Sequence, residues 1–409
     1  MALSTRALIL YGPKDLRLET VTLSPPGDDE LQISLRSITL CGSDLHYYNS
    51  FRNGSITVKQ PLILGHESSG VVTAIGNGVP NFKIGDRVAL EVGIPCGECA
   101  FCCAEEEDAE KLTRYNLCEK MRFRSSARGW PHEQGVLQER INHPSRLCYL
   151  LRDKVTLDQG ALIEPLSVAI HATRRAGLNL DPHGKILIFG AGAVGLLCAY
   201  VAKRTAGPDS QITITDIDNG RLQFALSHGF ADHIHLTTCS SGTLGEKLEE
   251  AQDTATSLIR FGAPGSSESL VRTSAGFSTI YECTGAESSL QTAIHAAKPG
   301  ANIMLVGMGT PIQMLPISAA AMREVNLCGV FRYAHTYQFA IDMFADVERR
   351  ENSVRGPSVP LVDLEKLITH RFVGLERGKE AFEMAGRKED EVGKRVIKVV
   401  IELDEESTA

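Results

Sequence analysis

Short runs of apolar and β-branched residues alternate with turn residues over positions 1–150. Leu31–Leu40, Gly70–Ile75 and Arg87–Glu91 have the composition and length of β-strands. Gly76-Asn-Gly78 and Gly85-Asp86, which flank two of these runs, are typical of tight turns. The pattern predicts a small, irregular, barrel-like β domain.

The pattern changes at Lys185. Lys185–Phe189 has the length of a buried strand, and Gly190-Ala-Gly-Ala-Val-Gly195 follows it directly. Apolar residues then recur at helical spacing. Further candidates are the strands Gln211–Asp216, Thr279–Cys283 and Asn302–Val306, with a helix, Ser288–Ala297, before the last of them. Strands alternating with helices predict an α/β domain, in which helices cover both faces of a parallel sheet.

Two further stretches complete the pattern. Residues 331–409 return to a mixed composition and end in an alternating strand, Arg395–Glu402. Ile186–Ala202 is uncharged over 17 residues, but a membrane span needs about 20. Because it also holds three glycines in a turn motif, we interpret it as strand, turn and buried helix.

Composition excludes several classes of protein. The chain has 409 residues, and 42 Lys and Arg against 50 Asp and Glu give a formal charge of −8. A nucleic-acid or membrane-surface binder needs a basic face, so we expect neither kind of partner. The start of the chain lacks the basic and apolar regions of a secretory signal. Eleven cysteines, five of them within Cys96–Cys118, indicate a metal site in a reducing compartment, and we expect a cytoplasmic protein.

The glycine-rich turn predicts a dinucleotide site. Gly190 permits the tight turn, Gly192 lets the backbone approach a pyrophosphate, and Gly195 allows close packing of helix on strand. Asp216 lies 21 positions beyond the third glycine, where a carboxylate accepts ribose hydroxyls and repels a 2′-phosphate. This favours NAD over NADP, although Arg221 is placed to reach the adenine ribose. The alternative is a glycine-rich turn in an unrelated α/β domain.

Four cysteines have spacings suited to one metal ion. Cys96, Cys99, Cys102 and Cys118 offer four thiolates, the donor set of a closed structural zinc site. Fifteen residues separate the last two, and Cys103 competes with Cys102 for the third position. The alternative is a cluster of free thiols.

A second, more diffuse set of candidate ligands lies elsewhere. A thiolate, an imidazole and carboxylates with an open position make a catalytic zinc site. Glu164 stands in an apolar context, where a carboxylate is costly unless it is paired or bound to metal. The candidates are Cys41, His66, Glu67 and Glu164, with Ser43, Asp44 and His46 beside the first of them.

At these residues the chain resembles the zinc-containing medium-chain dehydrogenases, and within them the polyol dehydrogenase branch. The resemblance covers most of the chain. Its segments are Cys41-Gly-Ser-Asp-Leu-His-Tyr47, Gly65-His-Glu67, Phe82–Val88, Cys96-Gly-Glu-Cys99, Arg114–Cys118, Gly160–Val168, the glycine turn, Val306-Gly-Met-Gly309 and Gly329-Val-Phe-Arg-Tyr333. Ile-Glu-Pro-Leu-Ser-Val within 163–168 and Val-Phe-Arg-Tyr within 330–333 mark the polyol branch.

The resemblance implies two domains. A GroES-like catalytic domain covers residues 1–166 and 332–409, and a Rossmann NAD-binding domain covers 167–331. Family members with the structural zinc usually have seven residues between the third and fourth cysteines. The fifteen found here require an acidic insertion, near Glu105–Leu112, to loop out.

The resemblance also implies roles for individual residues. The catalytic zinc maps onto Cys41, His66 and Glu67, with Glu164 as a ligand or joined through a water. The structural zinc maps onto Cys96, Cys99, Cys102 and Cys118. Polyol contacts map onto Tyr47, Glu164, Arg332 and Tyr333. Cofactor contacts beyond Gly190, Gly192 and Gly195 map onto Val194, Asp216, Arg221, Val306, Gly307, Met308, Phe331 and Arg332.

The implied activity is NAD-linked oxidation of a polyol. Zinc lowers the pKa of one hydroxyl, and hydride leaves the carbinol carbon for the nicotinamide. Ser43 passes the proton through the cofactor ribose to His46, or Glu164 accepts it through a water. Asp44 supports a metal ligand as an acceptor.

The leading hypothesis is oxidation of sorbitol or xylitol to the ketose, with a small-molecule polyol as partner. A second is a related zinc dehydrogenase acting on L-arabinitol, threonine or a vicinal diol, which differs at Tyr47, Ile56 and Arg332. A third is a catalytically silent binding protein on this fold. The family resemblance also implies a homotetramer or dimer, to which the strand Asn326–Val330 contributes.

Overall fold

The computed structural model describes residues 2–103, 113–177, 184–206, 210–238, 242–261, 276–351 and 362–404. Two compact units divide the chain between Ser167 and Val168 and again between Arg332 and Tyr333. Unit 1 combines Met1–Ser167 with Tyr333–Val354 and Leu364–Ala409, and unit 2 combines Val168–Arg332 with Arg355–Asp363. The insertion predicted near Glu105–Leu112 lies outside the described residues.

Unit 2 contains a six-stranded sheet in the order β15-β14-β13-β16-β17-β18, and every neighbouring pair is parallel. In chain order this is 3-2-1-4-5-6, the order of a Rossmann sheet. The strands are β13 (Lys185–Phe189), β14 (Gln211–Asp216), β15 (His233–Leu236), β16 (Phe277–Glu282), β17 (Ala297–Leu305) and β18 (Asn326–Gly329).

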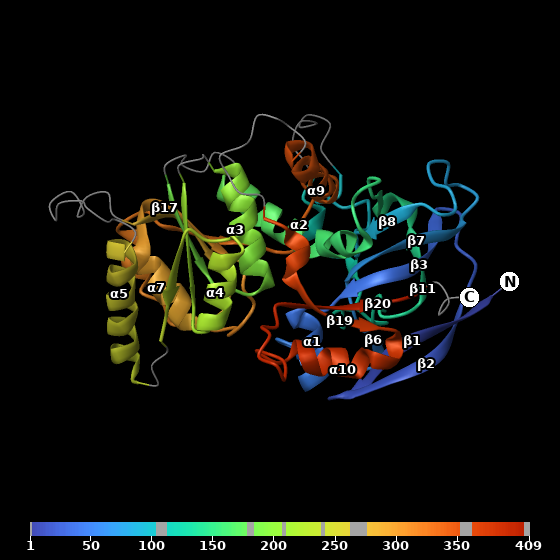
Figure 1. Ribbon diagram of the computed structural model, residues 1–409, viewed down its shortest axis with the longest axis horizontal. Coiled ribbons are helices and arrows are strands. Elements are labelled where there is room, and N and C mark those ends of the chain that lie inside the picture. The colour runs from blue at the N-terminus through green and yellow to red at the C-terminus, as the bar shows by residue number, and fades with distance from the viewer. Residues whose placement is uncertain are drawn as a thin grey trace. The chain divides into compact units, whose positions relative to one another are not determined.

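Helices cover both faces of this sheet. Figure 1 shows α3 and α4 on one side of the strands and α5 and α7 on the other. Successive residues of β13 point to opposite faces of the sheet, and both faces are apolar. Leu187 and Phe189 join the core under α5 and α7, and Ile186 and Ile188 on the other face are also fully buried. The helices are α3 (Ala193–Thr205), α4 (Asn219–Ser227), α5 (Leu244–Phe261), α7 (Glu287–Ala296) and α8 (Ile317–Ala321).

Unit 1 is built on a seven-stranded sheet around β3 (Glu30–Thr39). The strand pairs antiparallel with β7 (Glu67–Ile75), β20 (Lys398–Glu402) and β11 (Arg140–Pro144). The sheet continues through β8 (Arg87–Leu90) to β12 (Cys148–Leu150) on one side and to β19 (Ile368–Val373) on the other. A separate sheet has the order β2-β1-β6, from Asp15–Leu23, Leu3–Gly12 and Leu62–Ile63.

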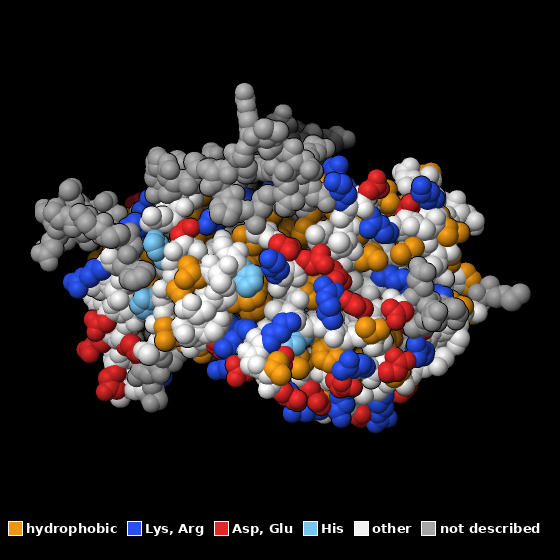
Figure 2. Space-filling view, in the orientation of Figure 1, with side chains coloured by type: hydrophobic (Ala, Val, Ile, Leu, Met, Phe, Trp, Pro, Cys, Tyr) orange, Lys and Arg blue, Asp and Glu red, His pale blue; other side chains and the backbone are white. Residues whose placement is uncertain are grey.

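Shorter elements and helices complete unit 1. Figure 2 shows Lys, Arg, Asp and Glu side chains intermixed on the face over α10 and β2. No helix in the described part of the chain is both long and apolar enough to cross a membrane. The remaining elements are α1 (Gly42–Ser50), α9 (Tyr337–Glu351), α10 (Gly378–Ala385), β4 (Arg52–Asn53), β5 (Ile56–Thr57), β9 (Gly93–Ile94) and β10 (Arg122–Phe123), while α2 (Leu157–Ala176) crosses the boundary between the units.

Most predicted strands are confirmed, and Lys185–Phe189 and Gln211–Asp216 match the observed bounds. The last strand begins at Lys398, three residues later than predicted, because Arg395 instead forms an isolated bridge to Glu389. The strand predicted at Asn302 begins earlier, at Ala297.

The helix that carries Glu164 starts well before that residue. It begins at Leu157. Thr156 Oγ1 accepts from Gln159 N–H, and Gln159 Oε1 accepts from Thr156 N–H, both at 3.1 Å. This is a capping box, and Thr156-Leu-Asp-Gln159 carried its sequence signature. Glu164 therefore lies inside α2, with Pro165 also within the helix.

Candidate metal and cofactor sites

Sheet register brings together three residues from two separate segments of the chain. Cys41 is the N-cap of α1, two residues after β3 ends, and Glu67 is the first residue of β7. Thr39 of β3 pairs with Glu67, so the end of one strand meets the start of the other. The ligand atoms of Cys41, His66 and Glu67 all lie within 4.8 Å of one another. We call these three residues the first cluster.

Asp44 holds the first cluster in shape. It is fully buried and accepts hydrogen bonds from Cys41 N–H at 3.1 Å, Gly65 N–H at 3.0 Å and Ser125 Oγ at 3.1 Å. Its carboxylate lies 3.3 Å from His66 Nδ1, which leaves the other ring nitrogen, Nε2, for a metal. Burial raises the pKa of Asp44, but His66 and the backbone N–H groups outweigh this, and the net pKa is lowered.

Glu67 has a partner that sequence reasoning missed. Lys398, the first residue of β20, places Nζ 2.7 Å from Oε1 and 2.5 Å from Oε2 of Glu67. Thr39 Oγ1 also donates to Glu67. Both charged side chains are at least nine-tenths buried, so each compensates the other. Nothing local in the sequence marks Lys398, because its significance comes from the pairing of β20 with β3.

Glu164 is buried close to the first cluster. Burial raises the pKa of its carboxyl to about 7, although the positive charge of His66 works against this. Tyr333 is also buried, and its hydroxyl makes no hydrogen bond of ordinary length among the described residues, although it lies close enough to the Glu164 carboxyl to lower the pKa of that group. The nearby Tyr47 is buried too, and its Oη accepts from Ala127 N–H at 3.4 Å. An orphaned buried hydroxyl beside a buried carboxyl is a group that a polyol hydroxyl would satisfy.

The residues predicted to carry the proton lie on α1. Ser43 is half-buried and His46 is exposed. Both belong to unit 1, as do Cys41, His66, Glu67 and Glu164.

A thiolate, an imidazole and a carboxylate are the donors of catalytic zinc sites. The first cluster offers this set from the half-buried Cys41 and the buried His66 and Glu67, and Asp44 supplies the outer carboxylate that orients a metal-bound histidine. The donors therefore fit zinc, and Glu164 is available as a further donor nearby.

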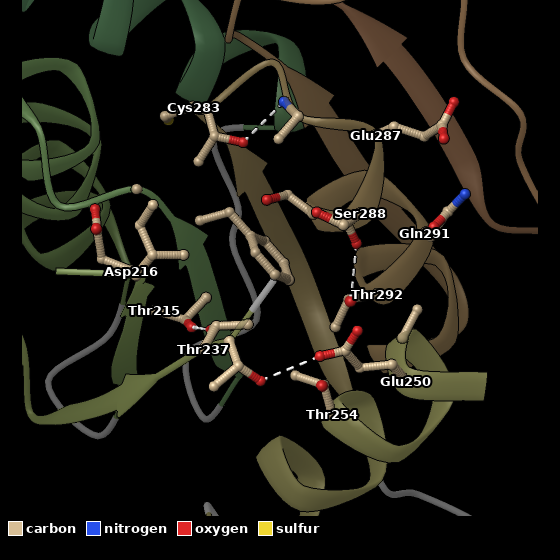
Figure 3. A pocket seen from close by; sticks show the side chains of 18 of the residues that line it. Thr215, Asp216, Thr237, Glu250, Thr254, Cys283, Glu287, Ser288, Gln291 and Thr292 are labelled. Carbon is tan, nitrogen blue, oxygen red and sulfur yellow. Dashed lines mark hydrogen bonds between the residues drawn. The ribbon is translucent and has the colours of Figure 1, made fainter. Parts of the chain in front are cut away.

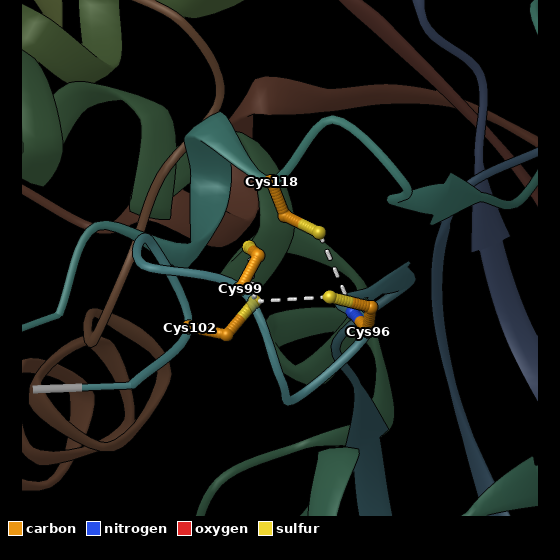
Figure 4. Close-up of side chains that lie close together, drawn as sticks. All are labelled: Cys96, Cys99, Cys102 and Cys118. Carbon is orange, nitrogen blue, oxygen red and sulfur yellow. Dashed lines mark hydrogen bonds between the residues drawn. The ribbon is translucent and has the colours of Figure 1, made fainter.

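The predicted structural site is a second cluster in unit 1. Figure 4 shows Cys96, Cys99, Cys102 and Cys118 turned toward one another. Their sulfurs lie within 4.8 Å of one another, with Cys99 and Cys102 3.4 Å apart and Cys96 and Cys102 3.8 Å apart. Tetrahedral zinc with Zn–S bonds of about 2.3 Å spaces its sulfurs by about 3.8 Å. The four thiols therefore fit one zinc ion, despite the long stretch between Cys102 and Cys118.

Local geometry favours a thiolate at Cys96. Backbone N–H groups of Glu98 and Cys99 lower the pKa of its thiol to about 6. Gly97, with φ of 80°, allows the turn that directs these groups at the sulfur. Cys103, the competing candidate, instead donates its thiol to the Gly97 carbonyl and is exposed.

The predicted dinucleotide site lines a cavity of about 550 Å³ in unit 2. Figure 3 shows its walls, which come from the ends of β14 and β16, from α5 and from the start of α7. Gly190 has φ of 97°, and a Cβ on Gly195 would lie 1.9 Å from the Gly190 carbonyl oxygen. A Cβ on Gly192 would meet only Arg221, at 4.0 Å, so this glycine leaves open space at the N-terminus of α3.

Asp216 lies at the end of β14 beside the glycine turn. It accepts from Ala191 N–H at 2.7 Å and from Asp218 N–H at 2.8 Å, which fixes its carboxylate at the cavity wall. Arg221 lines the same wall, and its Nε is buried with no partner among the described residues. Gly190, Gly192, Asp216 and Arg221 are therefore brought together.

The other predicted cofactor contacts do not line this cavity. Val306 and Gly307 both donate N–H groups to the Glu282 carbonyl, at 2.9 and 2.7 Å. The half-buried Val194 is in the first turn of α3, and Met308 is exposed. Arg332 stacks over the Phe331 ring at 4.8 Å. The cavity also has a wall at Glu287–Thr292 that no sequence motif marked, although the predicted helix over Ser288–Ala297 contains most of it.

Comparisons with known proteins agree with this architecture. Residues 27–153 match the model of the alcohol dehydrogenase GroES-like domain, and residues 193–346 match the model of zinc-binding dehydrogenases. Sorbitol dehydrogenase of Homo sapiens is 38% identical over 377 residues, 92% of this chain and 91% of that protein. L-idonate 5-dehydrogenase of Vitis vinifera is 32% identical over 395 residues, 96% of this chain and 93% of that protein.

A solved structure is also similar. The crystal structure of an oxidoreductase of unknown specificity from Escherichia coli has a TM-score of 0.78 and 26% sequence identity. The match covers 98% of this chain and all of that one. The predicted fold class, a Rossmann sheet with a GroES-like β-rich domain, is confirmed.

Proposed function

The chain belongs to the zinc-containing medium-chain alcohol dehydrogenases, in the polyol branch, and is therefore an oxidoreductase acting on a small molecule. From that premise we propose that it oxidises a secondary hydroxyl of sorbitol or xylitol to the ketose, with NAD as the oxidant and zinc at Cys41, His66 and Glu67. The identity to sorbitol dehydrogenases over nine-tenths of the chain supports this substrate class.

One observation carries the proposal. A thiol, an imidazole and a carboxylate converge within 4.8 Å, next to the buried Glu164 carboxyl and the unpartnered Tyr333 hydroxyl. A purely structural zinc site would be closed by its ligands and would have no reason to keep such groups beside it. A catalytic site needs an open position and polar groups that recognise a hydroxylated substrate.

When bound, zinc supplies a Lewis acid that makes the substrate hydroxyl easier to ionise, and NAD supplies the acceptor for the hydride. Cys41, His66 and Glu67 hold the metal, with Glu164 as a fourth donor or one joined through water. The glycine turn, Asp216 and Arg221 hold the dinucleotide, and Val194, Val306–Met308 and Phe331 remain proposed cofactor contacts. Cys96, Cys99, Cys102 and Cys118 hold the structural zinc.

The remaining side chains bind the substrate and carry its proton. Tyr47 and Tyr333 hydrogen-bond to polyol hydroxyls, and Arg332 of unit 2 stays a proposed contact for both polyol and cofactor. Ser43 accepts the hydroxyl proton and passes it to the exposed His46, from which solvent takes it. In the alternative route Glu164 accepts the proton through water, and a carboxyl pKa near neutrality suits that role.

The cofactor preference follows from charge at the cavity wall. Asp216 repels a 2′-phosphate, which favours NAD. Arg221 lies on the same wall and attracts such a phosphate, so its effect opposes that of Asp216. We propose NAD because the Asp216 carboxylate is fixed by two backbone N–H groups and cannot swing away without losing them.

Assembly and compartment complete the proposal. β18 is an edge strand of the six-stranded sheet, and an edge strand offers unpaired backbone groups to a second copy of the chain. This supports a homotetramer or dimer. Thiol donors in both clusters need a reducing environment, which supports a cytoplasmic location.

The test is NADH formation at 340 nm with D-sorbitol, xylitol, L-arabinitol, L-threonine and 2,3-butanediol, before and after zinc chelation. We expect chelator-sensitive turnover that is highest with sorbitol or xylitol. Turnover confined to L-arabinitol, threonine or the diol would keep the chemistry and overturn the substrate. A zinc-loaded protein that binds NAD but turns over none of them would be a silent member of the family.

A further inference from the structure

Unit 1 contains a cavity of its own, which is lined by two cationic side chains and an exposed indole. It has a volume of about 340 Å³ and is formed by Lys59, Ala127, Arg128, Gly129, Trp130 and His132. Trp130 is 71% exposed, whereas the neighbouring His132 is only 5% exposed. An indole left this open beside a buried histidine has a face available to a ligand.

His132 fixes the shape of this cavity. Its Nε2 accepts from Lys59 N–H at 2.8 Å, so its Nδ1 carries the proton and donates to the Gly129 carbonyl at 2.8 Å. The ring therefore joins the two walls, and it meets the Trp130 ring edge-on at 5.7 Å. The cavity is preformed by the chain itself.

The two positive charges of the cavity have no ion-pair partner in the part of the chain that the structure describes. Within the described residues, neither the Lys59 ammonium nor the Arg128 guanidinium makes an ion pair or side-chain hydrogen bond, and the lining holds no carboxylate. Glu133, the nearest acidic neighbour in the sequence, is paired with Arg122 at 3.6 Å. A guanidinium and an ammonium on one concave surface are suited to a carboxylate or a phosphate.

The segment that forms the cavity also borders the first cluster. The Phe123 ring lies 5.8 Å from the His66 ring, and Ser125 Oγ donates to Asp44. Ala127, part of the cavity lining, donates its N–H to Tyr47 Oη, the proposed polyol contact. Ala127 therefore links the cavity to the proposed polyol site, and Arg128 is the next residue along the chain.

We propose that this cavity is a subsite for the oxyanion of a negatively charged polyol, a sugar carboxylate or sugar phosphate. Arg128 and Lys59 bind the oxyanion, and the carbon-bound hydrogens of the sugar chain lie against the Trp130 ring. This inference rests on the proposed function, because it extends the class of substrates that the same site would oxidise.

Fluorescence tests binding directly, because Trp130 is the single tryptophan of the chain and lies in the cavity. The full chain is titrated with D-gluconate, D-glucitol 6-phosphate, inorganic phosphate and neutral D-sorbitol, without NAD. We expect a saturable emission change with the two sugar anions, a weaker response to inorganic phosphate, and none with sorbitol at equal concentration.

The double variant Lys59→Ala/Arg128→Ala should bind the sugar anions about tenfold more weakly or worse, because two charge-assisted contacts are lost. Lys83→Ala/Arg387→Ala removes the same charge from exposed positions outside the cavity and should bind like the parent. Lys59→Arg/Arg128→Lys keeps the charge and should retain most of the affinity. In turnover, kcat/KM for D-glucitol 6-phosphate should fall about tenfold in the first variant, with that for sorbitol unchanged.

Three results would overturn the subsite. They are no emission change with either sugar anion, equal loss of binding in the control variant, and inorganic phosphate binding as tightly as the sugar phosphate. Chelator-sensitive oxidation of sorbitol without anion binding removes the subsite and keeps the proposed function. Anion binding lost in the first variant, in a protein that oxidises no polyol, keeps the subsite and removes that function.

Discussion

Cys96, Cys99, Cys102 and Cys118 come from one stretch of 23 residues, whereas Cys41, His66 and Glu67 meet because β3 pairs with β7. The second cluster is a local loop whose first three cysteines are half-buried. In the first cluster His66 and Glu67 are buried, and Asp44 and Lys398 hold them in place. A closed ligand set in a loop suits a structural ion, whereas a supported but open set suits chemistry.

The difference also determines how strongly the loss of one side chain from each cluster affects the protein. In the second cluster, loss of one cysteine leaves the remaining thiols without their metal, close to solvent. In the buried cluster, loss of one charge leaves its partner unpaired inside the protein. The experiments below separate these two expectations.

The largest effect is expected from Cys41→Ser. Removal of a donor from the first cluster should lower kcat/KM roughly a thousandfold, because metal catalysis contributes several kcal/mol. NADH formation gives the rate, and elemental analysis should show one zinc per chain instead of two. Cys103→Ser, an exposed cysteine that belongs to neither cluster, is the control and should match the parent. Full activity in Cys41→Ser would remove the catalytic role of the first cluster.

Lys398→Met should destabilise the zinc-free protein by about 3–5 kcal/mol, since without metal it leaves the buried Glu67 carboxylate with no cation. Urea unfolding followed by circular dichroism gives the free energy of unfolding. The double variant Lys398→Met/Glu67→Gln should recover part of the loss, because no buried charge then remains unpaired. A single variant as stable as the parent would mean that Lys398 does not support the first cluster.

Cys99→Ser should lower stability by about 2 kcal/mol, or the melting temperature by roughly 4–8 °C, through loss of the metal from the second cluster. The initial rate at 25 °C should stay close to that of the parent, in contrast to Cys41→Ser. Cys103→Ser in the same loop is the matched control, because its exposed thiol donates only to a backbone carbonyl. If Cys99→Ser abolished turnover of folded protein, the two clusters would not have separate roles.

The smallest effect concerns His143, a histidine of β11 that belongs to neither cluster. His143 is buried, donates through Nε2 to the Glu91 carbonyl at 2.9 Å and accepts at Nδ1 from Arg124 at 3.1 Å. Burial lowers the pKa of His143 well below its usual value, and the neighbouring Arg124 charge lowers it further. Below about pH 6.5, His143 therefore binds a proton in the unfolded chain but not in the folded chain.

Stability should thus be complete above that pH and fall as the pH drops through it, by up to about 1.4 kcal/mol per pH unit. Urea unfolding between pH 5 and 8 measures this slope. His143→Gln offers an acceptor and a donor without a titrating group, so its slope should be flatter. An unchanged slope would assign the pH dependence to other groups.

The sequence determined the fold class, the family and most strands of unit 2, because each depends on local pattern; the short strand β15 (His233–Leu236) was not predicted. β13 and β14 were predicted at their observed bounds, and the glycine turn between β13 and α3 was evident from its spacing. The four-cysteine set was likewise recognised from spacing alone, and the structure places its sulfurs together across the long insertion. Their metal and their role stay predictions.

Tertiary structure alone decided what surrounds the first cluster. Lys398 lies 331 positions from Glu67, and only the pairing of β20 with β3 brings the two charges into contact. The cavity at Trp130 likewise depends on one hydrogen bond from Lys59 to a histidine 73 residues away. Spacing along the chain predicts contacts that a turn or a helix enforces. Contacts between distant segments depend on sheet register and burial, which no local pattern of residues specifies.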